Sequence, residues 1–392
     1  MPDIHAIQRE LRANRLDGWL FYDHHRRDPI AGRILNLQAN GLATRRWYYF
    51  IPAKGEPRKL VHRIEAGMLD SLPGRKNVYS SWEEQHAQLA RLMAGSKTVA
   101  MQYSPQNNIP YIGLVDAGTV ELVRKLGKKV VSSGDLVQTF EAAWSPDQLE
   151  SHLAAGKLVD QITREAFARA GSMVREGKAF TEYDLQQWMR AQFDANSLFA
   201  EDGPVVAVPP NNGNPHYEPK REGSKPVHAG DLLLLDVWAK FKRPGSVYYD
   251  ITWVGYLGDR VPEKYAKIFA IVKNARDAAV DFVKTSVAAK KEIHGWQVDN
   301  VAREVIRKAR HAKYFVHRTG HSIGQEVHGN GANMDGLETR DDRRIVPFTC
   351  FSIEPGIYMP EFGLRSEVNV YVGEHEARTT GAVQQEIILI LA

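Results

Sequence analysis

The sequence predicts two domains, an α/β domain followed by an α+β domain. Its 392 residues exceed what a single hydrophobic core usually supports. Residues 1–144 alternate short apolar runs with helical stretches, whereas residues 145–392 open with long amphipathic helices and continue into strand-rich segments. Where the pattern of apolar residues changes, Ser145-Pro146-Asp147-Gln148 is a helix-start signal. We therefore place the domain boundary at residue 145.

The first domain is expected to begin with a helix, because Ile4, Ile7 and Leu11 have helical spacing. Four later segments have the short apolar character of strands, and one between them has helical periodicity. The expected strands are GWLFY, RRWYYFIP, KLVHRI and KTVAM, and the expected helix is WEEQHAQLARLMAG. Alternation of this kind is typical of an α/β domain.

The second domain is expected to start with an amphipathic helix that carries Leu149, Leu153, Leu158 and Ile162. A further helix is expected at TEYDLQQWMRAQF. From about residue 203 strands dominate, interrupted by helices near 262–284 and 294–312. This order predicts an α+β architecture.

The composition narrows the class of protein. Hydrophobic residues make up 43% and charged residues 25% of the chain, as in ordinary soluble domains. The 51 basic and 47 acidic residues give a net charge of +4 and are scattered, so we expect no nucleic-acid partner. The single cysteine, Cys350, excludes an intramolecular disulfide and indicates a reducing compartment. The first twenty residues carry polar groups every few positions, so we expect neither a signal peptide nor a membrane span, and a cytoplasmic protein.

The stretch HRTGHSIGQEVHG, residues 317–329, fits two kinds of catalytic site. Gly320-His321-Ser322-Ile323-Gly324 matches the pattern of a serine nucleophile, with Asp335 and His375 as partners in the required order. Such a serine needs a strand before it and a helix after it. The following residues, QEVHGNGANMDG, have no helical periodicity. The sequence therefore favours a metal site over a serine hydrolase.

His317 and His321 also have the spacing of a zinc motif on a helix. Arg318 stands where that motif needs a glutamate, and Gly320 weakens any helix there. A helical zinc motif is therefore disfavoured.

Two aspartates lie in an expected β-hairpin, DLLLLDVWAKFKRPGSVYYDITWVGYL. Paired positions in an antiparallel hairpin sum to a constant, and Asp236 and Asp250 centre on residue 243, inside the turn. We expect the two carboxylates to face each other, apart from a slip of register. Two like charges about 4 Å apart repel by ~1 kcal/mol in water and ~4 kcal/mol at a dielectric constant near 20. A cation between them is expected.

The same arithmetic applies to CFSIEPGIYMPEFGLRSEVNVYV, where Glu354 and Glu367 centre on the turn between Pro360 and Glu361. Four carboxylates and one imidazole, His321, suit two divalent ions bridged by shared carboxylates. Oxygen-rich ligation favours Mn²⁺ or Co²⁺, with Zn²⁺ or Fe²⁺ as alternatives, over a thiolate site.

The ordered set Asp236, Asp250, His321, Glu354 and Glu367 lies within LLLLDV, YYDITW, TGHSIGQEVH, IEPGIY and GLRSEV. It resembles the creatinase/methionine aminopeptidase superfamily of pita-bread fold, peptidase family M24. Within that superfamily the chain is most similar to the Xaa-Pro peptidases, prolidase and aminopeptidase P. The resemblance covers the whole chain and implies an N-terminal α/β domain, residues 1–144, and a pita-bread catalytic domain, residues 145–392.

The resemblance also implies roles for individual residues. His216, in NNGNPHYEP, and His328 match histidines that assist catalysis, and Glu354 matches a ligand that also acts as general base. His317 and Arg365 match residues that bind the substrate.

Three departures from the family pattern stand out. The spacing between the two aspartates is longer, so the hairpin is expected to have a longer turn. Thr252-Trp253-Val254 replaces the common Thr-Arg-Thr, which removes an arginine that could contact substrate. Arg318 replaces a common glycine.

The expected activity is hydrolysis of Xaa-Pro dipeptides by a hydroxide held between two metal ions. The expected partners are short proline-containing peptides and a second copy of the chain in a homodimer. The loop at residues 22–29 is a candidate for closure over the partner's pocket. Alternatives are an aminopeptidase P for longer peptides, a creatinase-type amidinohydrolase, a binding module without catalysis, and a serine hydrolase.

Overall fold

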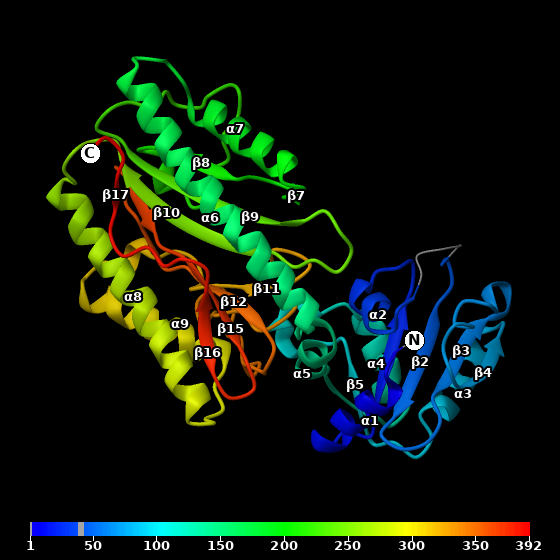
Figure 1. Cartoon of the computed structure of the whole chain (residues 1–392). Coiled ribbons are helices and arrows are strands. Elements are labelled where there is room, and N and C mark those ends of the chain that lie inside the picture. The colour runs from blue at the N-terminus through cyan, green and yellow to red at the C-terminus, as the bar shows by residue number, and fades with distance from the viewer. Residues whose placement is uncertain (1, 38–42) are drawn as a thin grey trace. The chain divides into compact units, whose positions relative to one another are not determined.

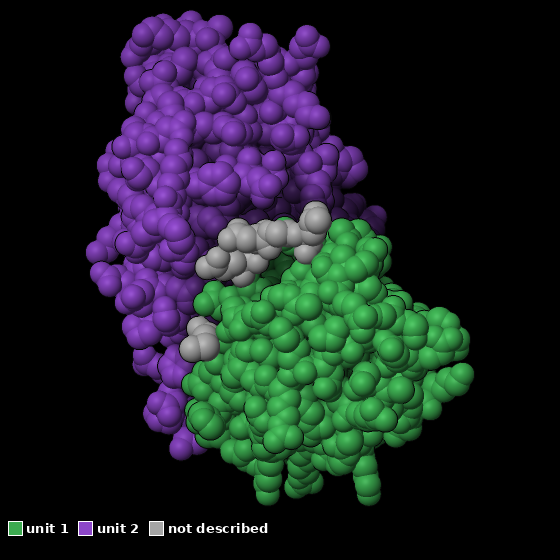
Figure 2. All heavy atoms as spheres, turned by 90° about the vertical axis from the view of Figure 1, so that its right-hand side faces the viewer, with its two compact units in different colours: residues 1–141 green, residues 142–392 purple. Residues whose placement is uncertain are grey.

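In the computed structural model, which describes residues 2–37 and 43–392, the chain divides into two units. Unit 1 comprises residues 1–141 and unit 2 residues 142–392 (Figure 2). None of the described helices is long and apolar enough to span a membrane.

A mixed β-sheet forms the centre of unit 1, with strand order β4-β3-β2-β1-β5-β6 among the described residues. The pairs β1–β2 and β2–β3 are antiparallel, and β3–β4, β1–β5 and β5–β6 are parallel. The strands are β1 (Gly18–Asp23), β2 (Trp47–Pro52), β3 (Arg58–His62), β4 (Arg75–Tyr79), β5 (Thr98–Met101) and β6 (Lys129–Ser132). The helices are α1 (Ile4–Ala13), α2 (Pro29–Ile34), α3 (Trp82–Leu92), α4 (Ala117–Lys125) and α5 (Gly134–Val137).

The two faces of this sheet are covered by different helices, because successive side chains of a strand point to opposite faces. Trp19 and Phe21 of β1 belong to the core that includes residues of α1 and α2. Leu20 and Tyr22 belong to the opposite core, with residues of α3 and α4. The predicted α/β character of the first domain is confirmed.

Long helices open unit 2, as predicted. The helices of this unit are α6 (Pro146–Arg175), α7 (Glu182–Ala195), α8 (Glu263–Ala288) and α9 (Gly295–Lys308). Ser145 caps α6: its hydroxyl accepts from the Gln148 N–H at 3.3 Å, and the Gln148 side chain accepts from the Ser145 N–H at 2.9 Å. This reciprocal pair satisfies two N–H groups that a helix start leaves unbonded.

The strands of unit 2 form separate sheets (Figure 1). One has the order β17-β10-β9-β7, with β8 also paired to β9, another has the order β11-β12-β15-β16, and β13 pairs with β14. The strands are β7 (Leu198–Phe199), β8 (Val205–Ala207), β9 (Leu232–Phe241), β10 (Tyr249–Tyr256), β11 (Ser322–Ile323), β12 (Cys350–Ile353), β13 (Gly356–Tyr358), β14 (Gly363–Arg365), β15 (Val368–Val372), β16 (Ala377–Thr380) and β17 (Ile388–Leu389).

Strand β9 separates two of the hydrophobic clusters of unit 2. Leu233 and Leu235 pack with residues of α6 and α7. Leu232 and Leu234 point to the other face and pack with residues of α8, α9, β12 and β15. Asp236 follows Leu234 on this second face by the alternation of the strand, so it points toward the layer that contains β12 and β15.

One predicted register is wrong and the other is confirmed. In the β9–β10 hairpin Asp236 pairs with Thr252, and Asp250 pairs with Trp238, so the two aspartates are diagonal rather than opposed. The pairing is centred one residue later than predicted, so the residue opposite Asp236 is two positions away from Asp250. Side chains alternate between faces with a period of two, so both aspartates remain on one face. In the second hairpin the β12–β15 and β13–β14 pairings continue one register, and that register places Glu354 opposite Glu367.

Candidate metal centre

The carboxylates of the two hairpins meet where β10 of one sheet lies beside the start of β15 of another. The Glu367 N–H donates to the Thr252 carbonyl oxygen at 3.2 Å, and the Asp250 N–H donates to Asn369 Oδ1 at 3.3 Å. These bonds tie β10 to the chain at the start of β15. Asp250 and Glu367 are 4% and 1% exposed, so the fold holds these two acidic side chains almost out of water.

His321 supplies a nitrogen to the same cluster. Its Nδ1 lies 3.1 Å from the Ser322 carbonyl oxygen, which can only accept, so Nδ1 carries the proton. The lone pair of Nε2 then faces Asp250 Oδ2 at 3.5 Å and Glu354 Oε1 at 3.4 Å. A lone pair aimed at carboxylate oxygens is repulsive unless a cation lies among them.

The geometry of the cluster suits a metal ion. One ligand atom from each of Asp250, His321 and Glu367 lies within 4.8 Å of the others. Asp250 Oδ1 and Glu367 Oε1 are buried and have no hydrogen-bond partner among the described residues. Buried carboxylate oxygens without a partner are costly, and coordination of a cation would satisfy them.

Burial and mutual repulsion act on the charges of these carboxylates. Burial raises the pKa of Asp250 and of Glu367 well above its ordinary value, and the neighbouring Glu354 and Asp250 charges respectively add to the rise. Burial raises the pKa of Asp236 to about 6, against the opposing charge of Arg365. Burial would raise the pKa of Glu354, but attraction to the protonated form of His321 and to Arg365 outweighs it and lowers this pKa. A bound cation would stabilise the ionised forms of the three carboxylates whose pKa is raised, Asp236, Asp250 and Glu367.

Arg365 supplies positive charge that offsets part of the negative charge of the four carboxylates. Its guanidinium donates to Asp236 Oδ2, to Thr252 Oγ1 at 2.9 Å and to the Tyr358 hydroxyl at 3.0 Å. The residue is 5% exposed. One cation against four carboxylates leaves a net negative site, which two divalent ions would more than neutralise.

Thr252, Ser352 and Tyr358 complete the site, and none of the three was expected there from the sequence. The Thr252 hydroxyl lies 2.9 Å from Asp236 Oδ1 and 2.8 Å from Glu367 Oε2. The Ser352 hydroxyl donates to Glu354 Oε1 at 3.1 Å. Hydroxyl residues are common in strands, so their types alone carried no signal. The alternation of β10, which puts Thr252 on the face of Asp250, could have identified Thr252.

The residues expected around the metal ligands lie at different depths. His317 Nδ1 donates to the Arg318 carbonyl oxygen at 2.7 Å, and its Nε2 accepts from the Tyr358 hydroxyl at 2.8 Å. Tyr358 thereby links His317 to Arg365. The His328 ring lies edge-on to His321, with the ring centroids 4.5 Å apart. His216 and His328 are both exposed, and the His216 charge contributes to the lowered pKa of His328.

Trp253 occupies the position of the expected arginine, and its side chain points away from the carboxylates. It packs in the core with α6 and α7, and the Arg164 guanidinium lies 5.3 Å from its ring centroid. In this register, an arginine at position 253 would also point to the α6 face.

The structure contradicts the serine-nucleophile alternative. Ser322 is 2% exposed, and its hydroxyl accepts from the Gly331 N–H at 2.9 Å. Asp335 accepts from the backbone of Leu337 and Glu338, both at 2.9 Å, and His375 is exposed. No helix follows the two-residue strand β11, so the strained turn that exposes a serine nucleophile is missing. The helical zinc motif is also excluded, because residues 317–321 are not helical.

Comparison with known proteins agrees with this geometry. Residues 154–374, more than half of the chain, match the metallopeptidase family M24. A Xaa-Pro dipeptidase of Pyrococcus furiosus is 26% identical over 257 residues, 65% of this chain and 67% of that protein. A Mycoplasma pneumoniae protein whose name describes a Xaa-Pro aminopeptidase is 29% identical over 237 residues, which span 59% of this chain and 61% of that protein. The crystal structure of dipeptidase PepE from Mycobacterium ulcerans has a TM-score of 0.71 at 23% identity and covers 99% of this chain and 96% of its own.

Buried carboxylates and an imidazole in this fold define a metal-dependent hydrolase. The chain belongs to metallopeptidase family M24. Its fold is a pita-bread catalytic fold preceded by an α/β domain, as the sequence predicted.

Proposed function

We propose that this protein hydrolyses the Xaa-Pro bond of short peptides, with dipeptides as the main substrates, and that two divalent ions are bound by Asp236, Asp250, His321, Glu354 and Glu367. The observation that carries the proposal is the convergence of one ligand atom each from Asp250, His321 and Glu367, on carboxylates whose buried oxygens Asp250 Oδ1 and Glu367 Oε1 have no hydrogen-bond partner in the described part of the chain. The names of the Pyrococcus and Mycoplasma relatives, which specify Xaa-Pro peptides, support the substrate class.

The bound ions would supply Lewis-acid chemistry and lower the pKa of coordinated water. Glu354 is the group suited to move a proton, because it is ionised and the Ser352 hydroxyl orients its Oε1. It would accept a proton from the attacking water and return it to the departing proline nitrogen.

His216 and His328 would donate hydrogen bonds to the developing oxyanion, a role often worth two or three powers of ten in rate. Their exposure leaves both rings accessible to a substrate. Repulsion between the protonated forms of the neighbouring His321 and His328 rings, together with partial burial, lowers the pKa of His328 to about 3, so at neutral pH it would donate as a neutral imidazole.

His317 and Arg365 would form the substrate side of the site. The Tyr358 hydroxyl donates to His317 and accepts a hydrogen bond from Arg365. We assign His317 to direct contact with the proline ring and Arg365 to positioning through Tyr358. Proline suits such a site because its φ is fixed and its nitrogen carries no hydrogen.

Two larger features belong to the same proposal. The family match lies within unit 2, which supports residues 145–392 as the catalytic domain and residues 1–144 as the N-terminal domain. We also propose a homodimer, which light scattering of the purified protein would test.

The decisive experiment is to remove metal with a chelator, reload Mn²⁺, Co²⁺, Zn²⁺ or Fe²⁺ separately, and assay three substrates side by side. Xaa-Pro dipeptides should be cleaved only after reloading, and non-proline dipeptides should not be cleaved. Faster cleavage of Xaa-Pro tripeptides would instead identify an aminopeptidase P. Activity that survives chelation and yields to a serine-directed inhibitor would overturn the proposal.

A further inference from the structure

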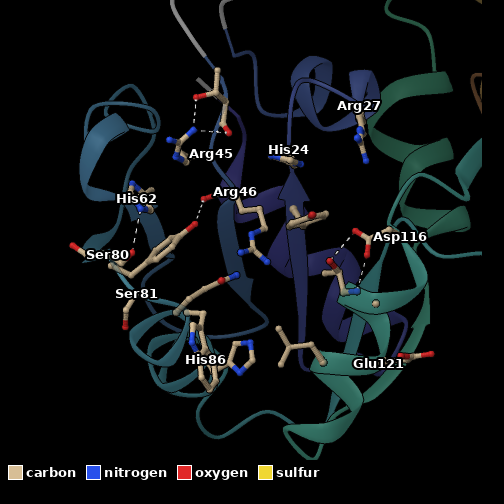
Figure 3. A pocket seen from close by; sticks show the side chains of 18 of the residues that line it. His24, Arg27, Arg45, Arg46, His62, Ser80, Ser81, His86, Asp116 and Glu121 are labelled. Atoms are coloured by element: carbon tan, nitrogen blue, oxygen red, sulfur yellow. Dashed lines mark hydrogen bonds between the residues drawn. The ribbon is translucent and has the colours of Figure 1, made fainter.

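A pocket of about 970 Å³ lies in unit 1 and takes no part in the metal centre (Figure 3). Its walls include Tyr22 at the end of β1, His62 at the end of β3, Tyr79 at the end of β4 and Thr44 before β2. The pocket therefore lies at the carboxyl ends of parallel strands, where open α/β sheets commonly bind ligands.

Two helices begin at this pocket. α3 starts after Ser81 and α4 after Asp116, and both residues line it. Helix N-termini favour negative charge. Both helices are already capped by their own side chains, so this feature supports an anion in the pocket without defining its position.

Positive side chains outnumber negative ones in the walls. The basic residues are Arg27, Arg45, Arg46 and Lys125, and the acidic residues are Asp116 and Glu121. Asp116 is engaged within α4, where its carboxylate accepts from the Thr119 N–H at 2.9 Å and the Thr119 hydroxyl at 2.8 Å. With the charges of both acidic residues counted, the walls still carry a net positive charge.

Arg46 is the central cation. Figure 3 shows its side chain extending into the middle of the pocket, between Ser80 and His86 on one side and Asp116 on the other. Its guanidinium makes no hydrogen bond or ion pair with any residue in the described ranges. Arg46 is exposed to solvent, and without an anionic partner its planar donors are free for a phosphate or carboxylate.

Trp82 adds an aromatic surface. The first residue of α3, it is 63% exposed and lines the pocket. Its ring lies edge-on to His86, with the centroids 5.4 Å apart. An exposed tryptophan beside cations can stack on a planar ring while the cations hold the charge of the ligand.

We propose that this pocket binds a small organic phosphate that carries a planar ring, a ligand of nucleotide size, with the phosphate on Arg46 and the ring on Trp82. The volume favours such a molecule over a bare phosphate, because pockets of roughly 300–1,000 Å³ enclose whole small molecules. The proposal is independent of the metal centre.

Calorimetric titration of the intact protein tests it, with AMP, adenosine and inorganic phosphate as probes. AMP should bind more tightly than inorganic phosphate, and adenosine more weakly than AMP. Arg46→Gln should weaken AMP binding at least about tenfold, whereas Arg9→Gln, an equal charge change at an exposed position outside the pocket walls, should leave it unchanged. Trp82→Ala should weaken the binding of AMP more than that of phosphate.

Failure of AMP to bind the wild-type protein, or equal binding to wild type and Arg46→Gln, would overturn the proposal. A change of oligomeric state in Arg46→Gln without binding of any probe would also overturn it, and would show that a second copy of the chain covers the pocket. A thermal unfolding profile of Arg46→Gln that matches wild type would show that both units of the variant are folded.

Discussion

Thr252 joins three charged groups of the metal centre through one hydroxyl. It lies within hydrogen-bond distance of Asp236 and Glu367, and it accepts from Arg365 Nε at 2.9 Å. A hydroxyl has a single hydrogen, so it donates to one carboxylate at a time. Thr252 therefore sets the orientation of two proposed ligands without being a ligand itself.

Replacing Thr252 by valine removes this hydroxyl and keeps the shape of the side chain. We expect Thr252→Val to weaken Mn²⁺ binding about 10- to 100-fold, the usual effect of losing a group that orients metal ligands. Calorimetric titration of the metal-free protein would measure the change. Thr252→Ser should restore most of the affinity. Wild-type affinity in the valine variant would show that the hydroxyl does not orient the ligands.

Glu367→Gln should separate metal binding from stability. Burial and neighbouring carboxylates raise the pKa of Glu367, so its charge destabilises the metal-free fold near neutral pH. The neutral variant should unfold at an equal or higher temperature than wild type without metal, and should lose most of the stabilisation on adding Mn²⁺. Glu304→Gln, at a surface carboxylate paired with Arg307, should keep the full stabilisation on adding Mn²⁺. Full metal stabilisation of Glu367→Gln would contradict its assignment as a ligand.

At the level of single residues, the sequence revealed charged groups more readily than neutral ones. Asp236 and Glu354 were conspicuous because an acid in an apolar strand is costly unless something pairs with it. Tyr358 gave no such signal, since a tyrosine in a strand needs no explanation. Its contacts with His317 and Arg365 depend on the fold of unit 2.

Among the structural elements, the chain just before β11 carries His321 and approaches β12 closely at Gly320. A Cβ on Gly320 would lie 1.9 Å from the Ser352 carbonyl oxygen, whereas a Cβ on Gly324 would meet nothing closer than 3.9 Å. Only the first of these two glycines is required by packing.

Gly320→Ala should therefore destabilise the protein by about 1–3 kcal/mol, the usual range for overpacking, and should displace His321. Gly324→Ala is the matched control from the same stretch and should stay near wild type. Thermal unfolding with and without Mn²⁺ measures both effects. Equal behaviour of the two variants would contradict the packing argument.

His152 connects α6 to two strands. Its Nδ1 lies 2.6 Å from the Tyr248 carbonyl oxygen, and its Nε2 lies 2.6 Å from Thr380 Oγ1. The residue is 0% exposed, and burial lowers its pKa from the ordinary 6.5 to about 4. The neutral imidazole is therefore the form that the fold accommodates.

This shift predicts how stability depends on pH. Between pH 6.5 and about 4 the unfolded chain binds a proton at His152 that the folded chain does not. The free energy of unfolding should thus fall as the pH falls through this window, by up to about 1.4 kcal/mol per pH unit from this residue. His152→Gln should reduce this dependence, measured by denaturant unfolding at several pH values. His5→Gln, on the exposed face of α1, should retain it, and an unchanged slope in His152→Gln would refute the assignment.

The elements found from sequence were those with strong periodicity or a cap. α6 was predicted from the Ser145 signal and from apolar spacing. The Ser145 cap is present, but of Leu149, Leu153, Leu158 and Ile162 only Ile162 is among the buried residues of the helix. The register of the β9–β10 hairpin was missed by two positions, because the turn between Phe241 and Tyr249 is longer than the two-residue turns for which register follows from loop length. Because side chains alternate along a strand, an error of two positions still leaves Asp236 and Asp250 on the same face, so the expectation of a shared carboxylate cluster was unaffected.

For the whole molecule, the sequence predicted the two-part organisation and the α/β and α+β classes. It did not predict β4, α4 or β6 of unit 1. β4, Arg75–Tyr79, has mostly polar and exposed side chains, so it lacks the apolar pattern by which strands are identified. Its place at the sheet edge beside β3 comes from backbone pairing, which composition does not reveal.

The central claim is that residues from two hairpins and His321 form a centre for two divalent ions. Titration of the metal-free protein with Mn²⁺, with binding counted per chain, tests it most directly. We expect two equivalents to bind to wild type and binding to be lost in Glu367→Gln. Absence of Mn²⁺ binding, or binding that Glu367→Gln leaves intact, would contradict it.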